Sequence, residues 1–153
     1  MSNNILLVLD LNKTLILRKS HNNVIKRKYF KEFKEFCFSV SDVSIYSSML
    51  EKNMELNRIF TDEEIKKLIF VWDRKKTIID KDGYNSWDSI KSLDIIREEY
   101  PNYEKIIIID DSESKLRFVS KDNKIIIQPF VKEDESEEVL KELINEIEKR
   151  IKF

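Results

Sequence analysis

Three apolar runs along the chain each end in polar residues, and together they predict a buried sheet. Such runs, rich in branched side chains, are typical of strands covered on both faces, as in a parallel sheet. Parallel strands bring their carboxyl ends to one edge, and open α/β sheets bind their ligands at that edge. The runs and the polar residues that follow them are Ile5–Leu9 with Asp10, Val43–Tyr46 with Ser47 and Ser48, and Lys105–Ile109 with Asp110 and Asp111.

Apolar residues at helical spacing predict the helices that cover this sheet. Thr61-Asp62-Glu63-Glu64 has the pattern of a capping box, in which the Thr61 hydroxyl and the Glu64 carboxylate bond free amides at a helix start. Pro101 ends the helix that precedes it, because the residue ahead of a proline avoids helical geometry. The other predicted helices cover Tyr29–Phe38, Met49–Phe60, Lys91–Tyr100 and Glu133–Lys152, and Lys124–Ile127 is a further predicted strand.

Two stretches depart from this alternation of buried strands and helices. The first contains two short extended pieces, Thr14–Lys19 and Val24–Lys28, joined by a turn at His21-Asn22-Asn23. The second contains short strands at Ile69–Trp72 and Thr77–Ile79, followed by a turn signal at Lys81-Asp82-Gly83.

These elements predict one domain over residues 1–153 with an α/β, three-layer fold around a central, mainly parallel sheet. A small β-rich insertion over about residues 69–86 takes the place of a large cap domain.

Composition narrows the classes of protein that fit. The chain has 153 residues, of which 41% are apolar and 37% charged, and its net charge is −1. This near-neutral charge gives no general attraction to nucleic acid or anionic lipid, so a nucleic-acid partner is not expected. No apolar run approaches the roughly 18 residues of a membrane span, and the first run lacks the basic region of a signal peptide. The single cysteine, Cys37, excludes an internal disulfide framework and fits an intracellular, reducing compartment, either cytoplasm or nucleus.

The polar residues at the predicted sheet edge form a set with a specific chemistry. Asp10, Asp110 and Asp111 supply carboxylate oxygens, which hard cations such as Mg2+ prefer. Ser47 and Lys91 supply a hydroxyl and an ammonium group that would hold an anion. A metal ion, an anion and a free carboxylate together indicate phosphoryl transfer to Asp10.

Two classes of α/β protein place acidic residues in this way, and the order along the chain separates them. A receiver domain has an acidic pair after its first strand and its lysine last. Here the order is Asp10, Ser47, Lys91 and then Asp110-Asp111, which resembles the haloacid dehalogenase superfamily. The finer pattern is similar to the C-terminal-domain phosphatase branch, the small phosphatases named after a nuclear LIM-interactor-interacting factor.

This resemblance covers the chain from about residue 5 to residue 150. Each motif is weak alone, and their common order and spacing make the match specific. The matching segments are Asp10-Leu11-Asn12-Lys13-Thr14 for Asp-x-Asp-x-Thr, Lys26-Arg27-Lys28 for Lys-Arg-Pro, Ser47 after its strand, Lys91-Ser92-Leu93 for Lys-Asp-Leu, and Asp110-Asp111-Ser112 for Asp-Asn-Ser.

The resemblance implies a role for each site residue. Asp10 would attack phosphorus and form an aspartyl-phosphate, Ser47 would bond a phosphoryl oxygen, and Lys91 would neutralise negative charge. An open site without a large cap implies a phosphoserine or phosphothreonine protein segment as the substrate and partner. The implied Mg2+ ligands are Asp10, Asp111 and the backbone carbonyl of Asn12, with Asp110 beside them.

Asn12 is the position at which the chain departs from the resemblance. The family has an aspartate there, which protonates the leaving oxygen and then activates water, whereas an amide does neither. We therefore expect a slow phosphatase or, as the alternative, a pseudophosphatase that binds phosphorylated partners or acts as a scaffold. Three explanations of Asn12 are open: a degenerate relative, a weak enzyme with another acid from the insertion, or an engineered residue.

Overall fold

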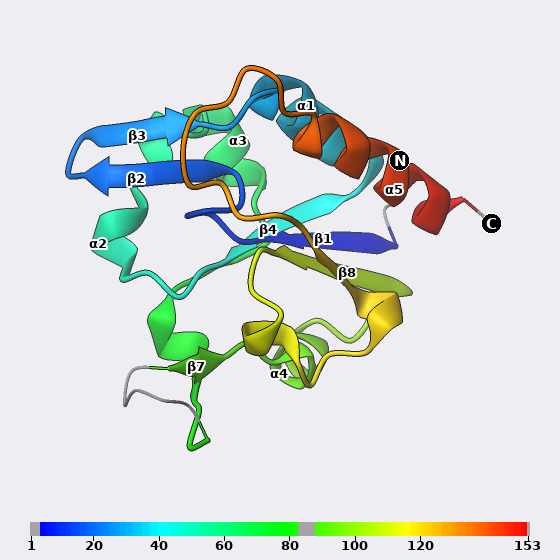
Figure 1. The fold of residues 1–153 in the computed structure, drawn as a ribbon. Helices are drawn as coiled ribbons and strands as arrows, with labels where there is room; N and C mark the ends of the chain where they lie inside the picture. Colours follow the sequence, from blue (N-terminus) through cyan, green and yellow to red (C-terminus); the bar gives the residue numbers. More distant parts are fainter. Residues whose placement is uncertain (1–3, 83–87, 153) are drawn as a thin grey trace.

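The computed structural model describes residues 4–82 and 88–152, and within them the core is a five-stranded sheet (Figure 1). Every neighbouring pair of strands in this sheet is parallel. Helices lie on both faces, which confirms the predicted α/β fold with a central parallel sheet. In spatial order the strands are β5 (Val71–Trp72), β4 (Asp42–Tyr46), β1 (Ile5–Leu9), β8 (Lys105–Asp110) and β9 (Lys124–Ile126).

The central strand β1 divides the core into two layers, because side chains alternate between the faces of a strand. Leu7 and Leu9 belong to the cluster on one face, and Leu6 and Val8 to the cluster on the other. All four are at most 2% exposed. Burying each such side chain contributes roughly 1.5–3 kcal/mol to folding. The strand that leads into Asp10 is therefore fixed by apolar contacts from both sides.

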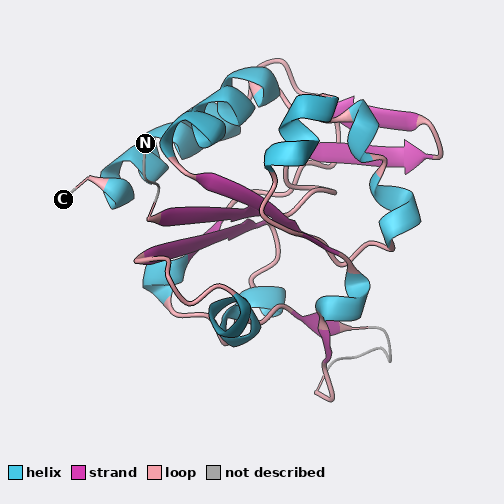
Figure 2. Cartoon of the chain, turned by 180° about the vertical axis from the view of Figure 1, so that it is seen from behind, coloured by secondary structure: helices cyan, strands magenta, loops and turns pink. Residues whose placement is uncertain are grey.

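Helices from distant parts of the chain cover the two faces of the sheet (Figures 1 and 2). α1 (Phe30–Val40) and α5 (Val139–Ile151) pack against each other on one face, where α5 buries Leu143 in the first cluster. α4 (Leu93–Glu99) lies on the other face and buries Ile96 in the second cluster. The predicted three-layer arrangement follows from these two separate apolar clusters.

A β-hairpin follows the loop after β1 and lies beside the carboxyl edge of the sheet (Figure 1). Its strands, β2 (Ile16–Ser20) and β3 (Asn23–Lys26), pair in antiparallel fashion, within two residues of their predicted limits. Asn22 has a φ of 64°, a left-handed geometry that asparagine tolerates better than most residues. The predicted turn is therefore confirmed.

The continuous helix predicted over Met49–Phe60 is wrong. The chain forms a short helix, α2 (Glu51–Met54), and then a 3-10 turn, η1 (Leu56–Arg58). Glu55 between them has a φ of 49°, so the backbone leaves the right-handed helical path there. Its carboxylate accepts a hydrogen bond from the side chain of Arg18 at 3.0 Å, a contact that apolar periodicity does not reveal.

The predicted capping box is confirmed and begins α3 (Asp62–Lys67). The Thr61 hydroxyl accepts from the Glu64 amide at 3.1 Å, and the Glu64 carboxylate accepts from the Thr61 amide at 2.8 Å. Beyond α3, the placement of Ile69–Trp72 in an insertion is wrong. Its last two residues form β5, which pairs in parallel with β4 as an edge strand of the central sheet.

Between β5 and α4 the described chain forms a small antiparallel pair of strands. A 3-10 turn, η2 (Arg74–Lys76), leads into β6 (Ile78–Ile79), which pairs with β7 (Ser89–Ile90). β7 was not predicted, because two residues give no readable period. Gly83 of the predicted turn lies outside the described residues.

Two helices begin later than their sequence patterns predict. α4 begins at Leu93, so Lys91 precedes this helix and does not open it. α5 begins at Val139 and not at Glu133, because the charged residues ahead of Leu140 offer no apolar side chain to the sheet. The remaining 3-10 turns, η3 (Ser114–Leu116) and η4 (Lys121–Asn123), both lie within the connection from β8 to β9.

Cys37 lies buried within α1 and forms no disulfide. Burial raises the pKa of its thiol above the usual 9.0, which disfavours the reactive thiolate. None of the helices in the described ranges is both long and apolar enough to cross a membrane.

Candidate functional site

Asp10 lies at the carboxyl end of the central strand, where the neighbouring strands also end. Its amide donates to the carbonyl of Ile109 at 3.0 Å, so the backbone stays in the sheet up to the carboxylate. Asp10 is 6% exposed. Register places Leu9 beside both Ile45 of β4 and Ile109 of β8, and thus the residues that follow these strands meet at one edge.

Lys91 contacts both Asp10, which follows β1, and Asp110, at the end of β8. Its Nζ lies 2.9 Å from Asp10 Oδ1 and 2.5 Å from Asp110 Oδ2, and its side chain is fully buried. The lysine backbone is fixed as well, since its amide donates to the carbonyl of Lys115 at 2.9 Å. Asp110 accepts a second bond from the Ser112 amide at 3.0 Å. One ammonium group thus bridges two buried carboxylates from distant segments.

Thr14 is the site residue to which the sequence analysis gave no role of its own. Its hydroxyl oxygen lies 2.7 Å from Asp10 Oδ2 and 3.1 Å from Asp111 Oδ1. The single hydroxyl proton is shared between two carboxylates, which fixes their mutual orientation. The threonine of the Asp-x-Asp-x-Thr pattern was the available signal for this contact.

We call Asp10, Asp110 and Asp111 the acidic cluster. Each contributes one oxygen to a group whose members all lie within 4.8 Å of one another. Burial and the charge of Asp110 raise the pKa of Asp10 from its usual 3.8 to about 7, against the lowering effect of Lys91. The pKa of Asp111 is raised for the same two reasons. With Lys91 as the only cation that contacts it among the described residues, the cluster has an excess of negative charge.

The cluster has the donor set that a hard divalent cation requires. Carboxylate oxygens are the preferred ligands of Mg2+, and the close approach of three of them is unfavourable without a compensating charge. A bound cation would favour the ionised forms of Asp10 and Asp111, whose pKa values burial now raises. The residues present therefore fit Mg2+.

Lys91 stays charged in this setting. Burial alone would lower its pKa, but the charges of Asp10 and Asp110 outweigh burial and raise the pKa above the usual 10.5. A permanently protonated lysine cannot act as a base, so its chemical contribution is a fixed positive charge.

Ser47 lies at the same edge, directly after β4. It is fully buried, and its amide donates to the carbonyl of Trp72 at 2.9 Å. The hydroxyl oxygen accepts from the Met49 amide at 3.0 Å, which leaves the hydroxyl proton able to donate to a ligand. The neighbouring Ser48 is half-buried.

Asn12 lies in the loop after Asp10, and its side chain has a structural partner. Its Oδ1 accepts from the Arg18 amide at 3.0 Å, and residue 12 forms a β-bridge with Ile16. The carboxamide therefore braces the start of the hairpin. An aspartate at this position could accept the same bond, so the loop geometry does not require an amide.

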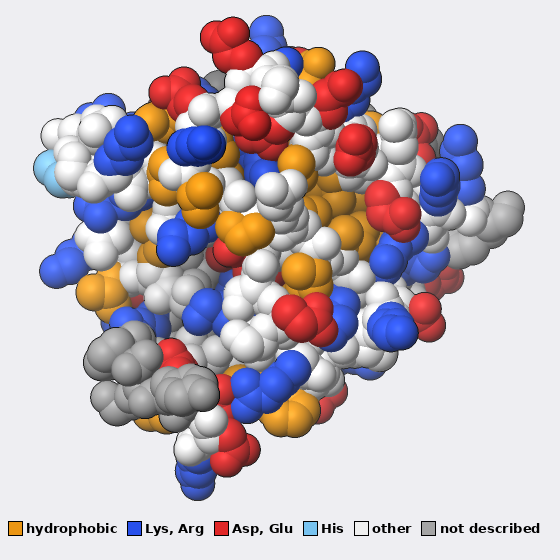
Figure 3. Space-filling model, in the orientation of Figure 1, with side chains coloured by type: hydrophobic (Ala, Val, Ile, Leu, Met, Phe, Trp, Pro, Cys, Tyr) orange, Lys and Arg blue, Asp and Glu red, His pale blue; other side chains and the backbone are white. Residues whose placement is uncertain are grey.

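The stretch from residue 11 to residue 31, which forms this loop and hairpin, contains no acidic residue. Lysine and arginine side chains gather around the hairpin on the face drawn in Figure 3. The cationic residues of the stretch are Lys13, Arg18, Lys19, Lys26, Arg27, Lys28 and Lys31. Arg18 and Arg27 are paired with Glu55 and Glu137, so the exposed lysines of this stretch are the charges that would attract an anionic group towards the sheet edge.

Comparison with solved structures shows the same fold in a larger enzyme. A variant of the fission yeast RNA polymerase II CTD phosphatase Fcp1, bound to beryllium fluoride, aligns with a TM-score of 0.53 and 15% identity over 92% of this chain and 48% of that one. A second Fcp1 structure, described as an essential RNA polymerase II CTD phosphatase, aligns with a TM-score of 0.51 and 15% identity over 95% and 47%. The chain spans about half the length of these structures.

Comparison with protein families gives the more specific result. None of the proteins with curated descriptions matches the sequence. The family model described as NLI interacting factor-like phosphatase matches residues 5–152, which is nearly the whole chain. The chain therefore belongs to the NLI interacting factor-like phosphatase family of the haloacid dehalogenase superfamily.

Proposed function

We propose that this protein is a Mg2+-dependent phosphatase that acts on phosphoserine or phosphothreonine in protein segments. The observation that carries the proposal is the meeting of Asp10, Lys91 and the Asp110-Asp111 pair at one sheet edge, within a chain of a phosphatase family. The absence of a large cap in the described residues favours an extended segment over a small metabolite.

In the first half of the proposed reaction, a carboxylate oxygen of Asp10 attacks phosphorus. A phosphorus–oxygen bond to Asp10 forms, the ester bond to the substrate breaks, and the leaving oxygen takes a proton from solvent. In the second half, water attacks the aspartyl-phosphate and loses a proton to solvent, inorganic phosphate leaves, and the Asp10 carboxylate is regenerated.

The other residues have supporting roles in this proposal. Lys91 neutralises charge on Asp10 and on the phosphoryl group, and the free hydroxyl proton of Ser47 donates to a phosphoryl oxygen. Mg2+ would be held by Asp10, Asp111 and the backbone carbonyl of Asn12, with Asp110 beside them. Bound there, the ion would supply positive charge for the phosphoryl oxygens and for the ionised Asp10.

Asn12 limits the rate in this proposal. Its carboxamide neither gives nor takes a proton, and general acid–base catalysis is typically worth about 10²–10⁴-fold in rate. Substrates with good leaving groups, such as p-nitrophenyl phosphate, need little protonation in the first half-reaction. They would therefore be the substrates that the chain handles best.

Asn12 also supports a second candidate function, a pseudophosphatase that binds phosphorylated partners or acts as a scaffold. Its Oδ1 is held by the Arg18 amide, and Lys91 remains protonated. Neither group would activate water against an aspartyl-phosphate. In this second proposal the site recognises phosphate and Mg2+ without turnover.

The deciding experiment measures p-nitrophenyl phosphate hydrolysis with Mg2+ for three proteins: the unaltered chain, Asn12→Asp and Asp10→Asn. The phosphatase proposal expects slow turnover by the unaltered chain, faster turnover by Asn12→Asp, and none by Asp10→Asn. Activity in Asn12→Asp alone supports the binding module. Circular dichroism of each protein is the control for folding, and no turnover by folded Asn12→Asp would overturn the phosphatase proposal.

A second assay compares substrates on the active protein. Phosphoserine and phosphothreonine peptides should be hydrolysed in preference to a 5′-phosphorylated oligonucleotide of equal concentration. Preference for the oligonucleotide would replace the protein-segment proposal with a nucleic-acid end phosphatase.

A further inference from the structure

Arg27 is a buried arginine that contacts none of the carboxylates of the acidic cluster. It is 3% exposed, and its Nη1 donates to the carbonyl of Thr14 at 3.0 Å. Its Nε lies 2.8 Å from Glu137 Oε2, and the guanidinium lies over the ring of Phe130, 5.4 Å from the centroid. A buried guanidinium needs such a full set of partners, because removing its charge from water is costly.

The carbonyl that Arg27 binds belongs to the loop that carries the site. Thr14 supplies the hydroxyl shared by Asp10 and Asp111. The residue before it, Lys13, has a φ of 69°, a left-handed geometry that is unfavourable for a lysine. Such a backbone conformation persists only where the surrounding contacts hold it in place. The loop therefore depends on groups outside itself.

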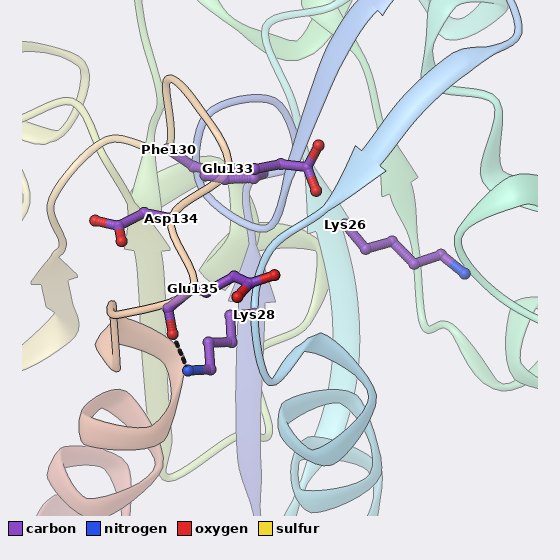
Figure 4. A pocket seen from close by; sticks show the side chains of 6 residues that line it. All are labelled: Lys26, Lys28, Phe130, Glu133, Asp134 and Glu135. Atoms are coloured by element: carbon purple, nitrogen blue, oxygen red, sulfur yellow. Dashed lines mark hydrogen bonds between the residues drawn. The ribbon is translucent and has the colours of Figure 1, made fainter.

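The segment between β9 and α5 supplies several of these contacts. The Phe130 amide donates to the carbonyl of Lys13 at 2.6 Å, and the Glu137 carboxylate holds Arg27. Lys28 donates to the carbonyl of Glu135, as the dashed line in Figure 4 marks. This segment faces β3 across an open groove of about 390 Å³ (Figure 4).

We infer that Arg27 is a positioning residue, which ties the loop after Asp10 to the segment between β9 and α5 and so holds Thr14 against the carboxylates. Glu137 orients Arg27, and Arg27 acts on the site only through the Thr14 peptide. The expected effect of Arg27 on catalysis rests on the proposed function, whereas its expected effect on the loop does not.

The geometry distinguishes this role from that of a simple ion pair. An arginine fork can bind a carboxylate with one nitrogen and a carbonyl with another, while lysine presents a single compact charge. Arg27→Lys should therefore keep the attraction to Glu137 and lose the bond to Thr14. Arg150 is a matched control, since its guanidinium also binds a glutamate, Glu146, and backbone carbonyls, but those of η4 and β9.

The first measurement is amide hydrogen exchange of Arg27→Lys and Arg150→Lys without metal or substrate. The amides of Thr14, Leu15 and Ile16 all donate to the carbonyl of Leu11, so they report on the loop directly. We expect their exchange to be roughly tenfold faster in Arg27→Lys than in Arg150→Lys, because a loosened loop opens more often. Equal rates in the two variants would overturn the inference.

The second measurement separates positioning from folding through the function of the site. Mg2+ affinity is measured by calorimetry, and kcat and KM are measured for p-nitrophenyl phosphate in the most active form of the chain. Losing a group that orients metal ligands typically costs about 10–100-fold in affinity or activity. We expect the loss in Arg27→Lys to lie at the low end of this range, with kcat reduced roughly tenfold and KM changed by no more than about twofold.

Glu137→Gln provides a second route if Arg27→Lys does not fold. This variant keeps Arg27 and weakens only the bond that orients its guanidinium. The loop amides should therefore exchange faster than in the unaltered chain, but by a smaller factor than in Arg27→Lys. If no form of the chain turns over substrate while the loop amides respond, the proposed function fails and the positioning role stands. If the chain turns over substrate, and Arg27→Lys has the same loop-amide exchange rates and the same kcat as Arg150→Lys, the positioning role fails while the proposed function stands.

Discussion

The acidic cluster and the environment of Glu55 are two carboxylate sites with opposite charge balance. The acidic cluster has three carboxylates and one ammonium group, that of Lys91, which contacts two of them, Asp10 and Asp110. Around Glu55, two guanidinium groups share one carboxylate: Arg18 Nε lies 3.0 Å and Arg58 Nε 3.3 Å from its oxygens. The acidic cluster therefore has an excess of negative charge, and the Glu55 site has an excess of positive charge.

The pKa shifts follow this difference. Burial and the charge of Asp110 raise the pKa of Asp10, whereas the Asn22 amide and the Arg18 guanidinium lower the pKa of Glu55 below its usual 4.5. A carboxylate with a lowered pKa is already satisfied and braces the structure. A carboxylate with a raised pKa would gain stability in its ionised form from an added cation, and this property is typical of candidate sites and not of structural ion pairs.

Removing Lys91 should have the largest effect on folding. Lys91→Met leaves buried carboxylates without their cation, and breaking a buried pair in this way costs about 3–5 kcal/mol. The free energy of unfolding, measured by urea denaturation without Mg2+, should fall by that amount. Arg18→Met, at the oversupplied site, is the control and should lose clearly less. Equal losses would mean that the two sites do not differ.

Mg2+ should stabilise the acidic cluster and leave the Glu55 site unchanged. A ligand at 100 times its dissociation constant adds about 2.7 kcal/mol to the free energy of unfolding if it binds only the folded state. We expect this gain in the unaltered chain and in Glu55→Gln, and its loss in Asp111→Asn. A gain that survives Asp111→Asn would place the metal elsewhere.

Without Mg2+, the two sites should give stability changes of opposite sign with pH. Folded Asp10 keeps its proton up to about pH 7, whereas the unfolded side chain loses it near 3.8. The folded state therefore binds more protons between these values, and its stability falls as the pH rises from about 4 to about 7. Urea denaturation in chelator at several pH values measures this fall. Asp10→Asn should reduce this fall and leave the part that comes from the raised pKa of Asp111.

Glu55→Gln should have the smallest effect. Because the folded pKa of Glu55 is lowered, its contribution is present above about pH 4.5 and is lost as the pH falls through the folded value. The stability difference between Glu55→Gln and the unaltered chain should therefore be small at pH 7 and disappear in acid. A difference that grows in acid would contradict the lowered pKa.

Sequence patterns predicted the parts of the site that follow long apolar runs. Asp10 and Asp110 come after buried strands, so their position at one edge follows from the parallel sheet. Lys91 was identified as a site residue, but its predicted place at the start of a helix was wrong, because it follows β7, a strand of only two residues. So short an element depends on its pairing partner, here β6, and periodicity carries no information about that partner.

Contacts made by polar atoms were the least predictable. The helix ends at Glu55, where the backbone is left-handed, although the helix propensity of the residues that follow would continue it. The side-chain contact between Glu55 and Arg18 takes the place of the next helical turn. Nothing in the spacing of residues indicated that Arg27 would be buried against Thr14 and Glu137. Such a bond depends on the exact path of two loops.

The pairing of β1 with β8 also sets an order of events during synthesis. β1 ends at Leu9, yet its neighbour on one side, β8, begins only at Lys105. Contacts between such distant segments close slowly, because a long intervening loop must first lose its freedom. During translation, Asp10 is therefore present long before Lys91 and the Asp110-Asp111 pair, which complete the candidate site.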